Sequence, residues 1–519
     1  MSELLLSLAP VPTMLARMRA ELSADFGDLA RESGRAVRIS RAPGRLDIMG
    51  GIADYTGSLV CEATLDRAAV VALSTRDDRQ VQVFSFNLYD EHQPFTFRIP
   101  LAALADNTAE TLGRELNQPG RKWAGYVVGC LFMLHEQGHI DLHNPAVKGL
   151  NLAIYSTVPL GAGVSSSAAL EVATMLNLVD HFGIPKPQRL DQQSDAEAAL
   201  SAPPDSALQH SALSISPTGL SAMQLAALCQ SVENRIVGVP CGVMDQVTSC
   251  LGEAGSLLRL ACQPHELQPS LRLPSGIRFI GINSNVKHSV GGGQYGRTRC
   301  AAFMGHKIIL DRMRRMGAAA GRVLVADPMN GYLANLDPDD YKKLFRPYLP
   351  ERQKGGEFLL QYGPTVDKVT RVEPDHIYSV QRATDHHVLE ARRVRNFVSY
   401  LEQAAAAPPG TRERGSPLDR AGHLMYASHL SYTNDAMLGA DECDLLVKLA
   451  RDREPAGIYG AKITGGGAGG TVAVLADVSP RADAAIAEIL VEYEKQTGRR
   501  PELLQGTSPG GWHVGTAET

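Results

Sequence analysis

The chain has 519 residues, of which 44% are hydrophobic and 21% charged, and its formal net charge is −5. This length allows two or three domains, and the composition is typical of a soluble globular protein. There is no basic excess and no polybasic run, which argues against nucleic acid and a membrane surface as partners. No apolar run approaches the roughly 18 residues of a membrane span, and no basic residues precede the apolar run 4–8, so we predict neither a span nor a secretory signal.

The eight cysteines form no Cys-x-x-Cys pair and have no histidine at metal-ligand spacing. They are typical of scattered thiols in a reducing compartment, so we expect a cytoplasmic protein. The sequence does not distinguish a monomer from a homodimer.

The first half of the chain is predicted to combine amphipathic helices with short strands. The expected helices cover residues 11–33, 123–137, 166–182 and 222–237. The expected strands cover residues 36–40, 59–65, 68–74, 81–86, 95–99, 150–158 and 257–260. Residues 185–220 are rich in Pro, Ser, Asp and Gln, which predicts a surface insertion.

The second half is predicted to mix helices and strands in the same way. The expected helices cover residues 296–315, 377–404, 416–428, 441–452 and 482–497. The expected strands cover residues 277–284, 457–463, 470–476 and a terminal strand. Residues 324–375 hold several Pro, Gly and charged residues and predict no element. We therefore expect an α+β protein with two lobes, residues 1–272 and 273–519.

The most informative stretch, residues 157–171, reads Thr-Val-Pro-Leu-Gly-Ala-Gly-Val-Ser-Ser-Ser-Ala-Ala-Leu-Glu. Gly161 and Gly163 lack a Cβ, so their N–H groups can approach a ligand, and the helix that follows adds unpaired N–H groups and the positive end of its dipole. This combination suits a phosphate and therefore a nucleotide. The run lacks the Gly-Lys-Ser of a Walker A loop and the third glycine of a dinucleotide fingerprint. A plain turn before a buried helix is the alternative.

Two further segments strengthen the nucleotide hypothesis. Residues 41–57 read Arg-Ala-Pro-Gly-Arg-Leu-Asp-Ile-Met-Gly-Gly-Ile-Ala-Asp-Tyr-Thr-Gly, and residues 462–472 read Lys-Ile-Thr-Gly-Gly-Gly-Ala-Gly-Gly-Thr-Val. In this order, the three segments resemble the three motifs of the GHMP kinases, in particular the galactokinase branch and the kinase domain of plant L-arabinokinases. The resemblance implies an N-terminal lobe like ribosomal protein S5 domain 2 and a ferredoxin-like C-terminal lobe. It places the active site between the lobes and implies that ATP and Mg²⁺ are used.

The glycine loop is expected to hold the β- and γ-phosphates of the nucleotide. Its nucleotide-binding residues would be Gly161, Ala162, Gly163, Val164, Ser165, Ser166 and Ser167. A second backbone loop over nucleotide and substrate is expected from Gly465, Gly466, Gly467, Gly469 and Gly470. By resemblance, Ser167 binds the metal. The alternatives are that the serines only cap the helix and that the second loop is a glycine-rich hairpin.

Glu233 is a candidate metal ligand. It shares a helical face with small and apolar residues such as Ala226 and Cys229, where a carboxylate requires a partner. Mg²⁺ would serve, and by resemblance Glu233 is its second ligand. The alternative is a structural ion pair with Arg or Lys.

Asp245 and Arg45 are the candidate catalytic residues. Asp245 is predicted in the first turn of a short helix, where the dipole favours the ionised carboxylate. Arg45 follows Pro43-Gly44, read as a rigid turn that aims the side chain at Asp245 or at the transferred phosphoryl group. By resemblance, Asp245 is the base that takes the proton of the substrate hydroxyl. The alternatives are an ordinary first-turn carboxylate and a surface ion pair.

The resemblance also implies a sugar substrate. The expected sugar contacts are Arg45, Asp54, Gly242, Asp245 and Tyr295. Galactokinases carry Gly-Glu-His-Thr-Asp-Tyr in the first motif, whereas residues 50–55 here read Gly-Gly-Ile-Ala-Asp-Tyr. By resemblance, the missing Glu and His contact the C6 hydroxymethyl of galactose, and Asp54 contacts O3 and O4. A hydrogen-bonding group without a partner is costly, so Gly51 and Ile52 favour L-arabinose, which keeps the ring configuration and lacks C6.

These observations predict a sugar 1-kinase that converts ATP and L-arabinose into ADP and β-L-arabinose 1-phosphate. A galactokinase with a relaxed pocket is the second hypothesis. A galactokinase-like sensor that binds ATP and sugar without turnover is the third. The presence of Asp245, Glu233 and Ser167 argues against the sensor.

Overall fold

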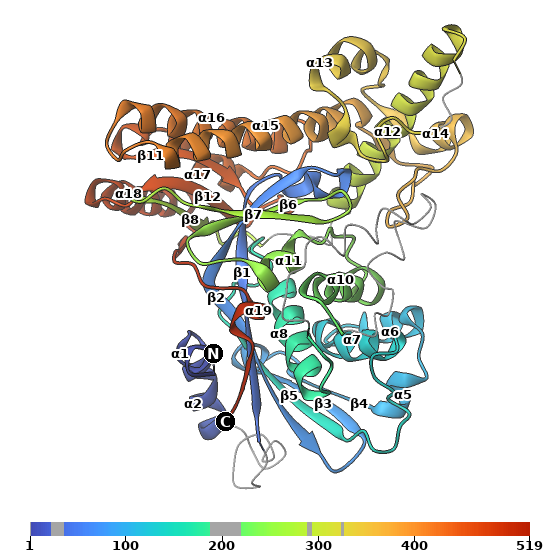
Figure 1. The fold of residues 1–519 in the computed structure, drawn as a ribbon, viewed down its shortest axis with the longest axis vertical. Helices are drawn as coiled ribbons and strands as arrows, with labels where there is room; N and C mark the ends of the chain where they lie inside the picture. Colours follow the sequence, from blue (N-terminus) through green and yellow to red (C-terminus); the bar gives the residue numbers. More distant parts are fainter. Residues whose placement is uncertain (1, 22–35, 187–218, 288–292, 323–325) are drawn as a thin grey trace.

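A computed structural model describes most of the chain (Figure 1). The described residues are 2–21, 36–186, 219–287, 293–322 and 326–519. The predicted insertion over 185–220 lies almost wholly outside them, as does the second half of the helix predicted over 11–33. The described residues fold into two lobes, each built on one large sheet.

The first lobe contains an eight-stranded sheet with the order β14-β1-β2-β5-β3-β4, extended by β6 beside β2 and by β7 beside β6. Its strands are β1 (Arg38–Met49), β2 (Leu59–Arg76), β3 (Gln80–Ser85), β4 (Thr96–Pro100), β5 (Gly149–Ser156), β6 (Ser256–Ala261), β7 (Glu266–Arg272) and β14 (Thr516–Glu518). Neighbouring strands are antiparallel, except that β3 and β5 are parallel.

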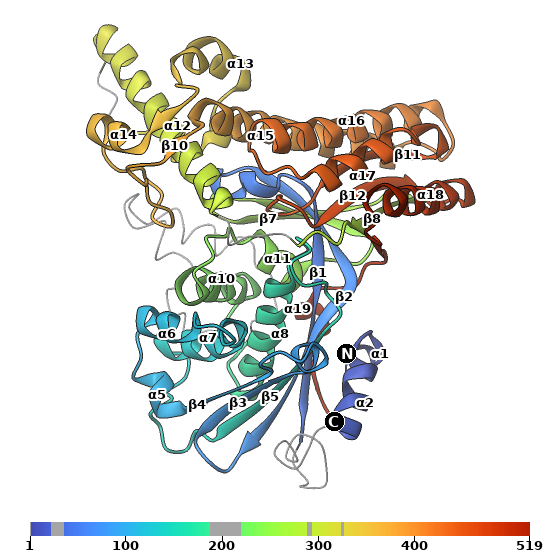
Figure 2. The ribbon, with the colours of Figure 1, turned by 180° about the vertical axis from the view of Figure 1, so that it is seen from behind.

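Helices cover both faces of this sheet (Figures 1 and 2). They are α1 (Ser2–Ser7), α2 (Val11–Glu21), α4 (Phe86–Asp90), α5 (Leu101–Ala105), α6 (Ala109–Leu116), α7 (Lys122–Glu136), α8 (Ser166–His181), α10 (Ala222–Val232), α11 (Met244–Leu251) and α19 (Gly511–Val514). Because successive side chains of a strand point to opposite faces of the sheet, β2 contributes to two cores, one on each face. Val71 and Leu73 pack with α7, α8 and α10, whereas Val70 and Ala72 pack with α1 and α2.

The second lobe contains a four-stranded antiparallel sheet with the order β11-β12-β8-β13. Its strands are β8 (Ile277–Asn283), β11 (Ile458–Ile463), β12 (Thr471–Asp477) and β13 (Glu502–Leu504). Its long helices are α12 (Gln294–Ala319), α15 (Val380–Ala406), α16 (Arg412–Asn434), α17 (Asp441–Arg451) and α18 (Pro480–Thr497). Helices α15 and α16 lie side by side along this lobe in both views (Figures 1 and 2).

Residues 326–378 contain short elements packed around the apolar side of α12, although the sequence predicts no element over 324–375 and a helix from residue 377. These are η5 (Leu333–Asn335), α13 (Pro338–Asp340), η6 (Tyr341–Phe345), η7 (Arg346–Tyr348), β9 (Gln353–Lys354), α14 (Gly355–Tyr362) and β10 (Ile377–Tyr378). Tyr341 and Phe358 are buried in this cluster.

The end of the chain returns to the first lobe. Strand β14 pairs with β1, and Arg38 lies opposite Glu518. The predicted boundary between residues 272 and 273 falls between β7 and β8, but the last strand belongs to the first sheet. The first lobe is therefore completed by residues that follow the second lobe in the sequence.

Several elements differ from the prediction. Residues 59–65 and 68–74 form one strand, β2, because the intervening Asp66 stays extended and its N–H donates to the carbonyl of Gly506 (3.2 Å). Strand β7 was not predicted. The helix predicted over 222–237 is α10 followed by a π-helical turn, η3 (Glu233–Val237).

Within the described residues, no helix combines the length and the apolarity needed to cross a membrane. All eight cysteines are described; none is in a disulfide, and seven are buried.

Candidate active site

Three segments far apart in the sequence meet at one place. These are the second half of β1, the loop before α8, and the loop between β11 and β12. The backbone N–H of Arg45 donates to the carbonyl of Val164 (3.1 Å), and its guanidinium donates to the carbonyl of Gly163 (2.8 Å). The hydroxyl of Thr471 donates to the carbonyl of Ala162 (2.8 Å). The structure therefore brings the three predicted motifs together.

Close backbone contact between the two glycine loops explains why side chains are absent there. A Cβ on Gly470 would lie 2.5 Å from the carbonyl oxygen of Ala162, and one on Gly465 would lie 2.7 Å from that of Gly163. Both glycines also have positive φ, 86° and 66°, which other residues rarely adopt. Gly466, Gly467 and Gly469 lie in the same loop. The third segment is thus more than a plain hairpin, because it packs directly on the second.

Asp245 lies in the first turn of α11, as predicted, and two side chains hold it. Nε and Nη2 of Arg45 donate to its Oδ1 (2.9 and 2.7 Å). The hydroxyl of Ser165 donates to its Oδ2 (2.5 Å). Ser165 is the N-cap of α8 with φ 59°, and its side chain caps no N–H of that helix. Its left-handed backbone is a strained conformation of the kind found at functional sites.

Arg45 is buried, with 2% of its surface exposed, so it is not part of a surface ion pair. Its guanidinium lies between Asp245 and Glu62, whose Oε2 is 3.2 Å from Nε. Burial opposes its charge, but the two carboxylates hold the pKa of Arg45 above its ordinary value. The reading of Pro43-Gly44 as a turn is wrong. These residues are inside β1, where the pairing with β2 shifts between Pro43 and Arg45. Such an irregularity tolerates proline and re-aims the following side chain.

Glu62, on β2 behind Arg45, is not among the residues that the motifs predict for the site. It is fully buried, and burial together with Asp47 raises its pKa well above the ordinary value, while Arg45 acts in the opposite direction. An acidic residue inside the apolar strand predicted over 59–65 is the signal that could have identified it.

A second buried ion pair joins the first and third motifs. Nζ of Lys462 lies 2.7 Å from Oδ2 of Asp47, and both side chains are fully buried. The same carboxylate accepts the N–H groups of Gly51 (3.0 Å) and Gly465 (3.2 Å). Loss of either partner would leave an uncompensated buried charge, so this pair fixes β1 relative to β11.

Glu233 is the first residue of η3 and is 6% exposed. Its Oε2 accepts from Nε2 of Gln246 (2.8 Å) and from the thiol of Cys241 (3.5 Å), and the hydroxyl of Ser167 also bonds to its carboxylate. Burial, assisted by Asp245, raises the pKa of Glu233 to about 7. Within the described chain, Glu233 forms no ion pair with Arg or Lys, so its charge has no cationic partner there.

Ser167 and Glu233 fit a divalent cation. Mg²⁺ takes hydroxyl and carboxylate oxygens, and it would supply the positive charge that Glu233 lacks. Among the described residues, no three His, Cys, Asp or Glu side chains are grouped to hold a metal. The remaining ligands would therefore be water and phosphate oxygens, which is usual for Mg²⁺. We call the 158–165 loop, Ser167 and Glu233 the phosphate end.

Asp54 and Gly242, two of the predicted sugar contacts, touch each other. Asp54 lies in the 3₁₀ helix η2 (Gly51–Thr56), is buried, and accepts the N–H of Tyr55 (2.7 Å). A Cβ on Gly242 would lie 1.6 Å from Oδ2 of Asp54. Burial raises the pKa of Asp54 to about 7. The carboxylate thus has one backbone partner and retains acceptor capacity for a ligand hydroxyl.

Tyr295 lies in the first turn of α12, and its ring packs edge-on against Tyr55 at 6.1 Å. Arg299, one turn later, lies over the same ring at 4.8 Å and pairs with Asp367 (2.9 Å). Asp367 lies within residues 326–375, where the sequence predicts no element, and its pair with Arg299 therefore links that region to the first motif. We call η2, Gly242 and Tyr295 the sugar end.

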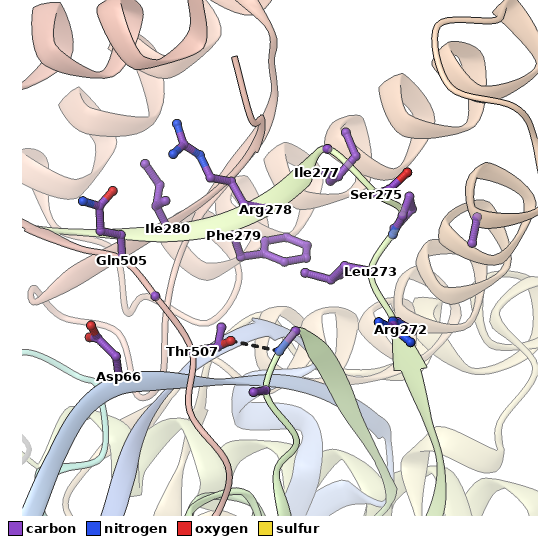
Figure 3. A pocket seen from close by; sticks show the side chains of 16 residues that line it. Asp66, Arg272, Leu273, Ser275, Ile277, Arg278, Phe279, Ile280, Gln505 and Thr507 are labelled. Atoms are coloured by element: carbon purple, nitrogen blue, oxygen red, sulfur yellow. Dashed lines mark hydrogen bonds between the residues drawn. The ribbon is translucent and has the colours of Figure 1, made fainter. Parts of the chain in front are cut away.

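A cavity of about 970 Å³ is lined by residues that belong to neither end (Figure 3). Leu273 and Phe279 line it together with the charged Arg272 and Asp66, and it contains none of the predicted site residues. Cavity size alone would not identify the candidate site. The cluster of buried, mutually perturbed ionisable groups around Arg45 identifies it.

Comparison with known proteins shows what this chain is similar to. Residues 125–203 match the GHMP kinases N terminal domain, and residues 26–75 match the galactokinase galactose-binding signature. The chain is 34% identical to the L-arabinokinase of Arabidopsis thaliana over 92% of its own length, and it spans 46% of the length of that protein. It is 28% identical to a galactokinase of Chloroflexus aggregans, over 95% of this chain and 97% of that protein.

The fold also has a counterpart among solved structures. The crystal structure of Lactococcus lactis galactokinase complexed with galactose matches with a TM-score of 0.65. The match covers 98% of this chain and 100% of that chain, at 20% sequence identity. The predicted two-lobed fold class is confirmed.

Proposed function

We propose that this chain, which resembles the galactokinase branch of the GHMP kinases, is an ATP-dependent sugar 1-kinase. The observation that carries the proposal is the position of Asp245. Its carboxylate is held by Arg45 and Ser165 at the end of the glycine loop, where α8 begins and where a residue that accepts a proton would lie beside a bound phosphate.

The reaction follows from these positions. The anomeric oxygen of the sugar forms a bond to the γ-phosphorus of ATP, the bond from that phosphorus to the β,γ-bridging oxygen breaks, and ADP leaves. Asp245 takes the proton of the anomeric hydroxyl, and Arg45 holds the Asp245 carboxylate in place and adds positive charge beside the transferred group. The 158–165 loop and the first turn of α8 offer N–H groups to the phosphates.

Magnesium would be held by Ser167 and Glu233, where it would neutralise phosphate charge. Its arrival would favour the ionised form of Glu233, whose pKa burial raises to about 7.

We further propose L-arabinose as the acceptor. The first motif carries Gly51 and Ile52 where galactokinases carry the Glu and His that contact C6, and Ile52 is buried among apolar side chains. A hexose would place a hydroxymethyl group where these two side chains offer no hydrogen bond. The likeness to the A. thaliana L-arabinokinase supports the same substrate.

Galactose is the second candidate, because the galactose-binding signature matches residues 26–75 and two galactokinases are each 28% identical to the chain over most of their length. We also propose a cytoplasmic location and no nucleic-acid or membrane partner.

The proposal is tested by measuring ADP release with L-arabinose, D-galactose, D-fucose and D-galacturonate. We expect the highest kcat/KM with L-arabinose. Faster turnover of galactose would refute the argument from C6 and favour the galactokinase. Measurable ATP binding without turnover of any of the four sugars would favour a sensor.

A further inference from the structure

The start of η2 has no room for a side chain at Gly51. A Cβ placed there would lie 1.9 Å from Oη of Tyr432 and 2.5 Å from Oδ2 of Asp47. Gly51 does not have a positive φ, so the restriction comes from these neighbours and not from the backbone. The volume that a side chain at residue 51 would fill is occupied by the hydroxyl of Tyr432.

Tyr432 comes from α16 in the second lobe and is fully buried. Its hydroxyl donates to the carbonyl of Gly465 (3.0 Å) and accepts the N–H of Ile52 (3.1 Å). Its ring lies 5.0 Å from Nζ of Lys462, whose charge is tied to Asp47. The ring is thus fixed at both its edge and its face, and it cannot move aside without breaking buried polar contacts.

We propose that Tyr432 determines which sugar the site accepts, by closing the sugar end at the position where residue 51 would meet C6. This inference rests on the proposed sugar 1-kinase activity. Tyr432 acts through Gly51: it forces residue 51 to be glycine and thereby removes the polar group a hexose would need. Ile52 is buried in the same apolar cluster as Tyr432, so the residue beside Gly51 also offers no polar group. The substrate class that fits is a galacto-configured pentose.

Exclusion by the closed wall and loss of a hydrogen bond predict different substrate preferences, and three sugars distinguish the two effects. The three sugars differ in the substituent on ring carbon C5. L-Arabinose has only hydrogen there, D-fucose has a methyl group, and D-galactose has a hydroxymethyl group. A closed wall disfavours both larger sugars, whereas a missing hydrogen bond alone would disfavour only galactose. We expect kcat/KM for L-arabinose to exceed that for D-fucose and for D-galactose by at least roughly tenfold each.

The test replaces Tyr432 and follows the ratio of kcat/KM between the hexoses and L-arabinose. Tyr432→Ala should raise the D-fucose to L-arabinose ratio by about tenfold, because it removes the wall. Gly51→Glu combined with Tyr432→Ala should raise the D-galactose ratio further. Tyr426→Phe is the matched control: it lies on α16 in the same apolar cluster but stacks with Arg451, and it should leave both ratios unchanged.

A measurement of thermal stability tests the same contact without the large Tyr432→Ala substitution. Gly51→Ala alone should lower the thermal midpoint, because of the contact with Tyr432, and adding Tyr432→Phe should recover part of that loss. If Gly51→Ala is tolerated without Tyr432→Phe, the inferred occupation of this volume is wrong.

The outcomes separate the two proposals. If wild type phosphorylates no sugar, the proposed function fails. If wild type phosphorylates L-arabinose but the Tyr432 variants lower kcat/KM for all three sugars by the same factor, Tyr432 is only structural and this inference is overturned while the kinase stands.

Discussion

The phosphate end and the sugar end of this site are built in different ways. At the phosphate end, backbone N–H groups, Ser167 and Glu233 come from the loop before α8, the first turn of α8 and η3, and they are the features expected from the motifs. At the sugar end, Gly51 and Ile52 replace two polar residues, and Tyr432 from the other lobe takes up the vacated volume. In the proposed reaction, phosphoryl transfer from ATP requires the same phosphate contacts for every acceptor. The contacts required by the acceptor change with the shape of the sugar. One end therefore follows the motif while the other departs from it.

The largest expected effect is on kcat and concerns Asp245, which we place between the phosphate end and the sugar end. Asp245→Asn should lower kcat roughly 10³-fold, because the acceptor of the hydroxyl proton is lost while its shape remains. The check is steady-state ADP release together with a thermal melt. Asp441→Asn, which changes another first-turn carboxylate of a helix, should keep wild-type kcat. A similar loss in both variants would contradict a catalytic role for Asp245.

The next prediction concerns the sugar end alone. Gly242→Ala should raise the dissociation constant of the sugar about 100-fold, because the new methyl group collides with Oδ2 of Asp54. ATP affinity should change less than threefold, an order-of-magnitude expectation for a distant contact. Isothermal titration with each ligand provides the measurement. Gly415→Ala, at a helical glycine with open space around it, is the control and should alter neither affinity. Equal weakening of both ligands would show that the two ends are not separable.

At the phosphate end, activity and stability should change in opposite directions. The pKa of Glu233 is raised from 4.5 to about 7 by burial, so the folded state binds its proton more tightly than the unfolded chain. The unfolding free energy therefore falls as pH rises between those two values. Glu233→Gln should raise the unfolding free energy at pH 8 by roughly 2 kcal/mol and lower the Mg²⁺-dependent rate. Glu253→Gln, at an exposed carboxylate, should do neither. A Glu233→Gln protein less stable than wild type at pH 8, measured by urea titration without Mg²⁺, would contradict this.

The smallest effect is a pH dependence that belongs to the sugar end. Burial raises the pKa of Asp54 from 3.8 to about 7, and its ionised form is the better acceptor for sugar hydroxyls. Sugar affinity without nucleotide should therefore rise about tenfold from pH 6 to pH 8. Asp54→Asn should flatten the profile, whereas Glu233→Gln should keep it. A profile flattened by Glu233→Gln would assign the titration to the phosphate end.

The predictable parts of the site are those with local signals. Small residues before a helix identify the 157–171 loop, and a carboxylate on an apolar helical face identifies Glu233. Both depend on backbone geometry within a few residues, which the sequence displays directly. The order of strands and helices was predictable for the same reason, although β1 and β2 were longer than expected.

The unpredicted parts depend on pairs distant in sequence. The Asp47–Lys462 ion pair and the contact of Tyr432 with Gly51 each join the two lobes. Proline and glycine at 43 and 44 are typical of turns, and only the pairing of β1 with β2 shows that they lie in a strand. No pattern within one segment specifies its partner in another.

The return of β14 to β1 has a consequence for biosynthesis. Val37 and Thr519 exchange backbone hydrogen bonds, and the two labelled ends lie near each other in Figure 1. Translation must reach residue 518 before the strand that carries Arg45 gains its second neighbour. Residues 38–40 therefore form an unpaired sheet edge in the nascent first lobe until the whole second lobe has been made.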